Sequence, residues 1–75
     1  MNYLVIEIQT NQDGTIGNLV YSYADRSQAE SKYHTILSSA AVSQLPVHAA
    51  ALMTAEGQLL ERKCYHHTVE AEETE

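Results

Sequence analysis

The hydrophobic pattern of this chain changes its period twice, and these changes constrain the fold more than any other feature. Residues 3–10 alternate between apolar and mixed positions, which is the pattern of a half-buried strand. From Asp25 the apolar residues recur at helical spacing, and after Pro46 a segment of strand length follows. Two pairs of strands joined by one helix, in the order β-β-α-β-β, are therefore expected.

The first pair of strands is expected to form a hairpin. Residues 11–14 read Asn-Gln-Asp-Gly, and a glycine accepts the positive φ of a tight turn. If Thr10 pairs with Thr15, the apolar positions coincide and residues 15–23 form the returning strand. In this register the helix covers one apolar set and leaves a second set on the other face. The covered set is Leu4, Ile6, Ile8, Gly17, Leu19 and Tyr21, and the uncovered set is Tyr3, Val5, Ile16 and Val20.

A helix over residues 26–43 is indicated by its start and stop signals. Asp25 is a suitable N-cap, and Gln28 three residues later completes a capping-box pattern. Pro46 prevents the helix from continuing and favours an extended conformation at Leu45. The stripe that should face the sheet consists of Ala29, Tyr33, Ile36, Leu37, Ala40 and Ala41.

The second pair of strands should span residues 47–54 and 58–67, joined by a turn that contains Gly57. The first of these strands is rich in alanine, a weak strand former, so a helical continuation stays open as an alternative. We favour a strand because a proline and the turn bracket a segment of strand length. A three-residue loop would place His48 opposite Cys64.

These elements predict an α+β domain over residues 1–68, with one helix on one face of a four-stranded, mainly antiparallel sheet. Residues 69–75 carry four glutamates and should form a disordered acidic tail. The pattern leaves open the strand order and the face of the second hairpin that meets the helix. Because the uncovered face is apolar and the core is small, we expect a homo-oligomer, a dimer or larger.

Charge and composition exclude several classes of protein. The formal net charge of −6 argues against a protein that binds duplex nucleic acid. Four of these charges belong to glutamates after residue 69, so residues 1–69 hold six acidic and four basic residues and a net charge of −2. A nearly neutral body of this kind is compatible with a small anionic ligand. The sequence shows no secretion signal and no membrane-spanning stretch, which predicts a cytoplasmic protein of a bacterial host.

Cysteine and histidine residues suggest two alternatives, a metal site and an enzyme. Cys64 and His66 share a strand face, and with His48 opposite Cys64 they would form a Cys/His/His set suited to zinc. The spacing lacks the pattern of known zinc sites, and a fourth ligand is missing. The second alternative, a small Cys/His enzyme, has no support from a nucleophile motif in the sequence. We therefore predict no catalysis, no metal and no cofactor, and we interpret Glu7 as a glutamate on the sheet surface.

The basic and aromatic residues instead favour a site for a small anion such as a nucleotide. Arg26 and Ser27 lie at the expected start of the helix, where free N–H groups and the helix dipole attract negative charge. Tyrosine rings can stack on a base. The predicted ligand-binding residues are Arg26, Ser27, Lys32, Tyr33, Arg62, Lys63, Tyr65 and His67.

Four segments resemble short uncharacterised proteins encoded in phage and prophage regions of gut Gram-positive bacteria. They are residues 3–11, 29–37 and 46–50, together with Cys-Tyr-His-His at residues 64–67. The resemblance implies a small accessory protein of a mobile element, and it carries no catalytic motif to transfer. Proteins of this size in such genomes often look like inhibitors of host defence, which bind a defence protein or sequester its nucleotide messenger.

The expected function is therefore that of a non-enzymatic binding protein. In the first mechanism, a homo-oligomer sequesters a small anionic, nucleotide-like ligand and so inhibits host defence. In the alternative, the uncovered sheet face or an edge strand docks on a host defence protein, in the manner of an anti-CRISPR inhibitor. Ligand, partner and oligomer symmetry are not determined by the sequence.

Overall fold

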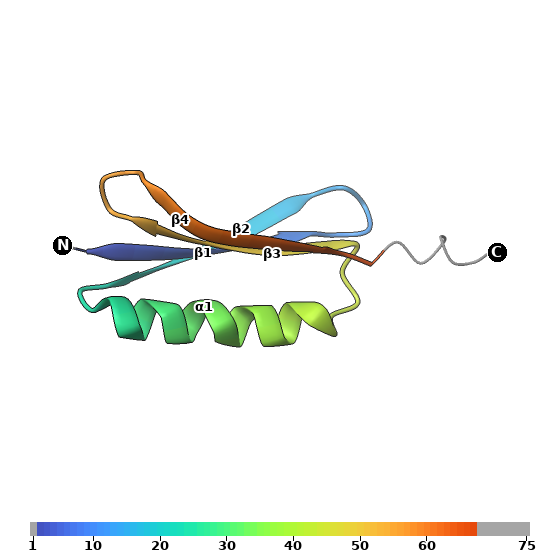
Figure 1. Ribbon diagram of the computed structural model, residues 1–75. Helices are drawn as coiled ribbons and strands as arrows, with labels where there is room; N and C mark the ends of the chain where they lie inside the picture. The colour runs from blue at the N-terminus through green and yellow to red at the C-terminus, as the bar shows by residue number, and fades with distance from the viewer. Residues whose placement is uncertain (1, 68–75) are drawn as a thin grey trace.

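Five elements follow one another along residues 2–67, the part of the chain that the structure, a computed structural model, describes. They are β1 (Tyr3–Thr10), β2 (Ile16–Tyr23), α1 (Arg26–Ala41), β3 (Val47–Thr54) and β4 (Leu59–His66) (Figure 1). Their order is the predicted one, although the helix ends before the expected Ser43. The alternative of a helical continuation after Pro46 is wrong, because residues 47–54 form a strand. The tail predicted at residues 69–75 lies outside the described residues.

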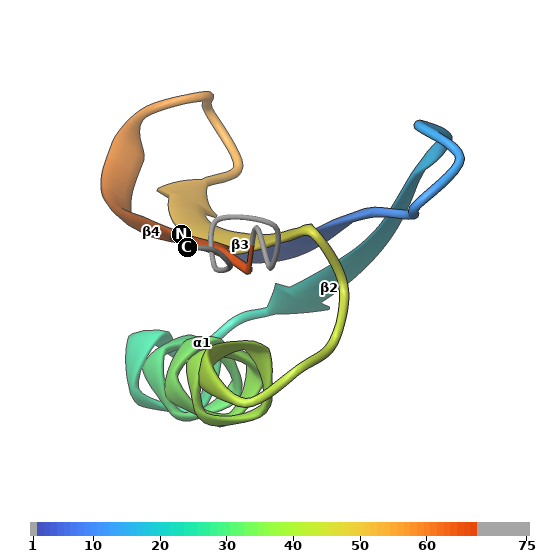
Figure 2. The ribbon, with the colours of Figure 1, turned by 90° about the vertical axis from the view of Figure 1, so that its right-hand side faces the viewer.

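The four strands form one antiparallel sheet in the order β2-β1-β3-β4, so β1 and β3 are central and β2 and β4 are the edges. The helix lies along one face of this sheet, and the opposite face is open (Figure 1). The chain therefore has the predicted α+β fold. Both hairpin turns bend away from α1, at opposite ends of the sheet (Figures 1 and 2).

The connection from β2 through α1 to β3 has a defined hand. Both β2 and β3 are antiparallel to β1, which lies between them, so these two strands are parallel to each other. Seen along the helix, the chain passes from β2 through α1 to β3 as a right-handed crossover (Figure 2). Connections between parallel strands of one sheet have this hand almost without exception. Once β1 lies between β2 and β3, the hand decides which face of the sheet the helix covers.

Local hydrogen bonds define both ends of α1. The Asp25 side chain accepts a hydrogen bond from the Ser27 N–H at 3.1 Å, as expected of an N-cap. At the other end, the Val42 N–H donates to the Ser39 carbonyl at 3.2 Å. These bonds satisfy groups that the helix ends would otherwise leave unpaired.

No helix among residues 2–67 has the length and apolar character that a membrane span requires.

The core lies between α1 and the sheet face that carries Val5. The prediction that the helix covers Leu4, Ile6 and Ile8 is therefore wrong, because neighbouring residues of a strand point to opposite faces. Most of the stripe predicted for the helix does face the sheet, but Ala41 at its end is exposed. Alanine and valine make up half of the buried core, and such short side chains let the helix approach the sheet closely. The buried core residues are Val5, Ala29, Tyr33, Ile36, Ala50 and Leu52.

A one-residue shift in the first hairpin accompanies this difference. Thr10 pairs with Ile16 rather than with Thr15. Asp13 Oδ1 accepts hydrogen bonds from the Thr15 N–H at 3.0 Å and from the Thr15 hydroxyl at 2.7 Å, and these bonds hold Thr15 in the turn. A shift of one residue moves every β2 side chain to the other face relative to β1. The β2 tyrosines thereby pack against the core, whereas Ile16 and Val20 lie on the open face, as predicted.

The second hairpin has the predicted three-residue loop, residues 55–57, but not the predicted register. A β-bulge next to Leu52 interrupts the pairing of β3 with β4 and adds one residue to β4. His48 consequently lies opposite Tyr65. The predicted pairing of His48 with Cys64 is therefore wrong, and these two side chains lie on opposite faces of the sheet.

Two leucines test the position of the core. Leu52 is fully buried, whereas Leu59 on the edge strand is 52% exposed. Replacing Leu52 with Ala should lower the free energy of unfolding by about 3 kcal/mol, because the lost side chain leaves a cavity. The matched change Leu59→Ala should cost less than about 1 kcal/mol. Urea unfolding of both variants at one protein concentration measures this difference, and equal losses would contradict the assignment of the core.

Candidate functional site

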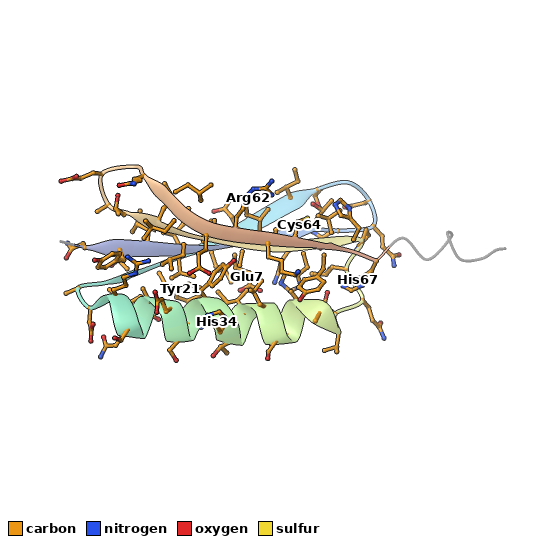
Figure 3. The ribbon with its side chains drawn as sticks, viewed as in Figure 1. Glu7, Tyr21, His34, Arg62, Cys64 and His67 are labelled. Atoms are coloured by element: carbon orange, nitrogen blue, oxygen red, sulfur yellow. The ribbon has the colours of Figure 1, made fainter. Side chains whose placement is uncertain are left out.

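The sheet separates the predicted ligand-binding residues onto two faces. Lys63 and Tyr65 lie on the face that α1 covers, whereas Arg62 lies on the open face. Figure 3 shows this division, with Arg62 and Cys64 on the side of the sheet away from the helix and Glu7 on the side facing it. The basic residues of β4 therefore do not converge on one site within a single chain.

The start of α1 is occupied by carboxylates of the protein itself. Arg26 Nε lies 2.9 Å from Glu30 Oε2 in an exposed ion pair between successive turns of the helix. The Ser27 N–H donates to the Asp25 side chain at 3.1 Å. An anion bound here would have to displace Asp25 and compete with Glu30 for the guanidinium. Arg26 and Ser27, both predicted to bind a ligand, thus already have partners in the free protein.

Lys32 and Tyr33 point in different directions from the helix. Lys32 Nζ lies 4.2 Å from the centroid of the Tyr21 ring on β2, which is a cation–π contact. Tyr33 is buried in the core. Burial raises the pKa of the Tyr33 phenol above its ordinary value of 10.0, and the charges of Glu61 and Tyr65 on β4 add to the rise. The phenol of Tyr33 is therefore neutral at physiological pH.

Three of the predicted residues form a continuous row at the edge of the sheet, here called the β4 row: Lys63, Tyr65 and His67. Lys63 Nζ lies 5.3 Å from the centroid of the Tyr65 ring. The rings of Tyr65 and His67 are parallel, with an interplanar angle of 4° and centroids 6.2 Å apart. His67 Nε2 lies 2.8 Å from the Ala40 carbonyl oxygen, which ties the end of β4 to the end of α1. A cation and two aromatic rings are thus aligned along one edge of the sheet.

A buried polar pair lies between the sheet and the helix. His48 Nε2 and Glu7 Oε2 are 2.7 Å apart, and their side chains are only 5% and 12% exposed. Gln9 Nε2 donates to the same carboxylate oxygen at 3.0 Å. Because an ionised carboxylate only accepts hydrogen bonds, His48 donates through Nε2. The other ring nitrogen, Nδ1, is buried and has no hydrogen-bond partner among the described residues.

The interpretation of Glu7 as a surface residue is therefore wrong, and the sequence contains a signal that points to the pair. Glu7 and His48 are each flanked on both sides by apolar residues of their strands. They are 41 positions apart in the sequence, and they meet only because β1 and β3 are neighbours in the sheet. Without the strand order, no rule of spacing brings them together.

The chemistry available to this pair is limited by its surroundings. A carboxylate that orients an imidazole is the arrangement of many general bases, but a base also needs a reacting proton within hydrogen-bond reach. Here the carboxylate is shared with Gln9, and the free nitrogen of His48 is enclosed between the sheet and α1. The pair thus links β1 to β3 inside the fold and does not present a reactive group to solvent.

Cys64 and His66 lie together on the open face, with Sγ and Nε2 3.5 Å apart. The zinc alternative required His48 beside them, and His48 lies on the covered face instead. Within residues 2–67, no group of three potential metal ligands is assembled. The alternative of a Cys/His enzyme would rest on Cys64 and His66 alone. Among the described residues, neither side chain has a hydrogen bond to a third polar side chain.

The open face is the largest feature that the helix leaves uncovered. Its most exposed apolar residues are Ile16 at 67%, Val20 at 56% and Leu59 at 52%. Among the described residues, no acidic side chain lies on it, and Arg62 is its one residue with a permanent charge. The residues of the open face are Leu4, Ile6, Ile8, Thr10, Ile16, Asn18, Val20, Ser22, Val47, Ala49, Ala51, Met53, Leu59, Arg62, Cys64 and His66.

No known protein family, curated protein or solved structure matches this chain. The two candidate surfaces, the open face and the β4 row, are therefore judged by their own geometry. The first is a broad apolar surface on the uncovered side of the sheet. The second is a narrow polar and aromatic row on the helix side.

A double-mutant cycle tests the buried pair. Glu7→Leu should lower the free energy of unfolding by about 2 kcal/mol or more, because it leaves the buried His48 Nε2 without an acceptor. The double variant Glu7→Leu/His48→Leu should recover part of this loss, since neither polar group then remains unpaired. Urea unfolding at neutral pH gives the coupling energy. The exposed Arg26–Glu30 pair, replaced in the same way, is the control, and an equal coupling in both cycles would contradict the burial described here.

Proposed function

We propose that this protein is a non-enzymatic binding protein and that the open face is the surface with which it binds another protein. The observation that supports this most strongly is the position of Leu4, Ile6 and Ile8. They lie on the uncovered face, although they form the more apolar of the two alternating sets of β1. Monomeric proteins rarely expose a continuous apolar surface of this extent. Such a surface is stabilised when a partner removes it from water.

The distribution of reactive groups supports binding rather than catalysis. The buried pair of Glu7 and His48 lies on the covered side of the sheet, and the thiol of Cys64 lies on the open side. Cys64 Sγ does lie 3.5 Å from His66 Nε2, but the open face carries no carboxylate among the described residues to orient this imidazole as the base of a nucleophile. The biological setting that we propose follows from the resemblance to phage proteins: inhibition of host defence in the bacterial cytoplasm.

One valine on the open face tests this function against a second, unrelated valine. Val20 lies on the open face and Val42 follows α1, and both are exposed, at 56% and 80%. At sub-micromolar concentration the wild-type protein should enhance the fluorescence of 1-anilinonaphthalene-8-sulfonate, a probe of accessible apolar surface. Val20→Asp should lower this enhancement several-fold, because it places a charge within the apolar surface, whereas Val42→Asp should not.

As a control, circular dichroism of the wild type and both variants should show that each is folded. Both variants gain the same negative charge, so repulsion of the anionic dye affects them alike. An equal enhancement for all three proteins would contradict the proposed function.

The β4 row supports a second candidate function, the sequestration of a small anionic, nucleotide-like ligand. Lys63 supplies a cation, and the parallel rings of Tyr65 and His67 supply a face on which a base can stack. A homo-oligomer could add basic residues from a neighbouring copy. The negative charge of Glu61 on the same strand face opposes such a ligand, and for this reason we place this function second.

Calorimetric titration with adenosine 5′-monophosphate tests the second candidate. Binding should be lost in Lys63→Gln, because the cation is removed from the β4 row, and should persist in Arg62→Gln, whose side chain lies on the other face. Heating the complex should release the nucleotide unchanged, as expected of a binding protein. Loss of binding in Arg62→Gln alone, or no binding by the wild type, would contradict this function.

A further inference from the structure

From the relief and charge of the open face we infer that its partner is a second copy of this chain, related by a two-fold axis that runs parallel to the strands between β1 and β3. This inference rests on the proposed function, because it concerns the same surface. It adds the identity of the partner and the residues that meet. The sizes of the side chains on the open face, its charge and its area each support a two-fold dimer.

The side chains of the two central strands differ in size on the open face. β1 presents a ridge of large side chains, Leu4, Ile6 and Ile8, whereas β3 presents a low stripe in which Ala49 and Ala51 are adjacent on that face. The ridge and the stripe are in register, because Ile6 pairs with Ala51. Each copy thus carries a ridge and, beside Ile6 and Ile8, a low stripe of two alanines that ends at Met53, opposite Leu4.

Symmetry decides how two such faces fit. In a two-fold dimer each patch meets the same patch on the partner. An axis parallel to the strands, between β1 and β3, places Ile6 and Ile8 over the partner's Ala51 and Ala49, and the end of the ridge at Leu4 over the partner's Met53. An axis across the strands would place ridge on ridge and stripe on stripe, with collisions and gaps. Stacked sheets are rotated by about 30° through their twist, and the strands nearest the axis stay in contact.

The same arrangement separates the charges. Arg62 lies in one row with Ala51, Ile6 and Val20 across the sheet. The parallel axis places Arg62 over the partner's Val20, at the edge of the interface, where its head group reaches water. The two Arg62 side chains then lie at opposite edges. The acidic residues of the described chain lie off this face, so the contact places no carboxylate against another and buries none.

The available area is sufficient for a specific dimer. The sheet has four strands of eight residues each. At about 3.3 Å per residue and about 4.8 Å between strands, it covers roughly 500 Å² in projection. Two such faces would bury roughly 1,000 Å² or more, which is where specific protein interfaces begin. A helix or peptide of one strand's width would leave much of this surface in water.

A size-swap experiment tests which residues meet across the axis. Ile6→Ala should weaken dimerisation roughly tenfold or more, because the symmetric interface loses the side chain twice. Ala51→Leu should also weaken it, because two ridges then collide. When the two variants are mixed, one contact of the heterodimer joins the shortened side chain of the first variant to the enlarged side chain of the second. The other contact joins the unchanged Ile6 and Ala51. Native mass spectrometry should therefore find the heterodimer well above the share expected from random exchange.

The matched controls are Val42→Ala and Ala41→Leu, which make the same kinds of change at exposed positions after and on α1. Their mixture should exchange at random. Mixing separates contacts between chains from those within a chain, because each variant keeps its own mismatch between positions 6 and 51 inside its sheet. Random exchange of the open-face variants would overturn the proposed axis. A wild type that stays monomeric at high concentration would overturn the second copy as partner, and the dye experiment with Val20→Asp would still decide the proposed function.

Discussion

The right-handed crossover from β2 through α1 to β3 is the constraint on which the rest of this structure depends. Two hairpins joined by a helix offer that helix two faces of one sheet, and the hand of the connection selects one of them. The selected face carries Val5, Ala50 and Leu52, whose side chains pack against the helix. Glu7 and His48 lie on the same face, so the fold encloses a polar pair in its interior.

The proposed function follows from the same constraint. One helix covers one face, and a chain of 75 residues has no second helix to cover the other among its described elements. The helix therefore leaves Leu4, Ile6 and Ile8 outside the core. Acidic residues of the described chain lie in the turns, on the helix or on the covered face, and the open face is left apolar and without negative charge. The proposed binding through this face would bury the apolar residues that the single helix leaves uncovered.

Particular residues show how far prediction from the sequence reaches. The bounds of β1 and β3 and the start of α1 follow from alternation, from the cap at Asp25 and from Pro46, which are local signals, whereas α1 ends at Ala41, before the expected Ser43. The two predicted registers are wrong by one residue each. In the first hairpin the side chain of Asp13 holds Thr15 in the turn, and in the second a bulge next to Leu52 shifts β4. A shift of one residue exchanges the faces, so the bulge alone separates the histidine of β3 from the cysteine of β4.

By itself the sequence determined the elements, their order, the helix stripe and the α+β class, because periodicity, caps and breakers act over a few neighbouring residues. Only the tertiary structure decided the strand order, the covered face and the pairing of Glu7 with His48. These properties depend on the hand of a crossover and on the register between distant strands. Both are set by the packing of the whole chain, and no local pattern encodes them.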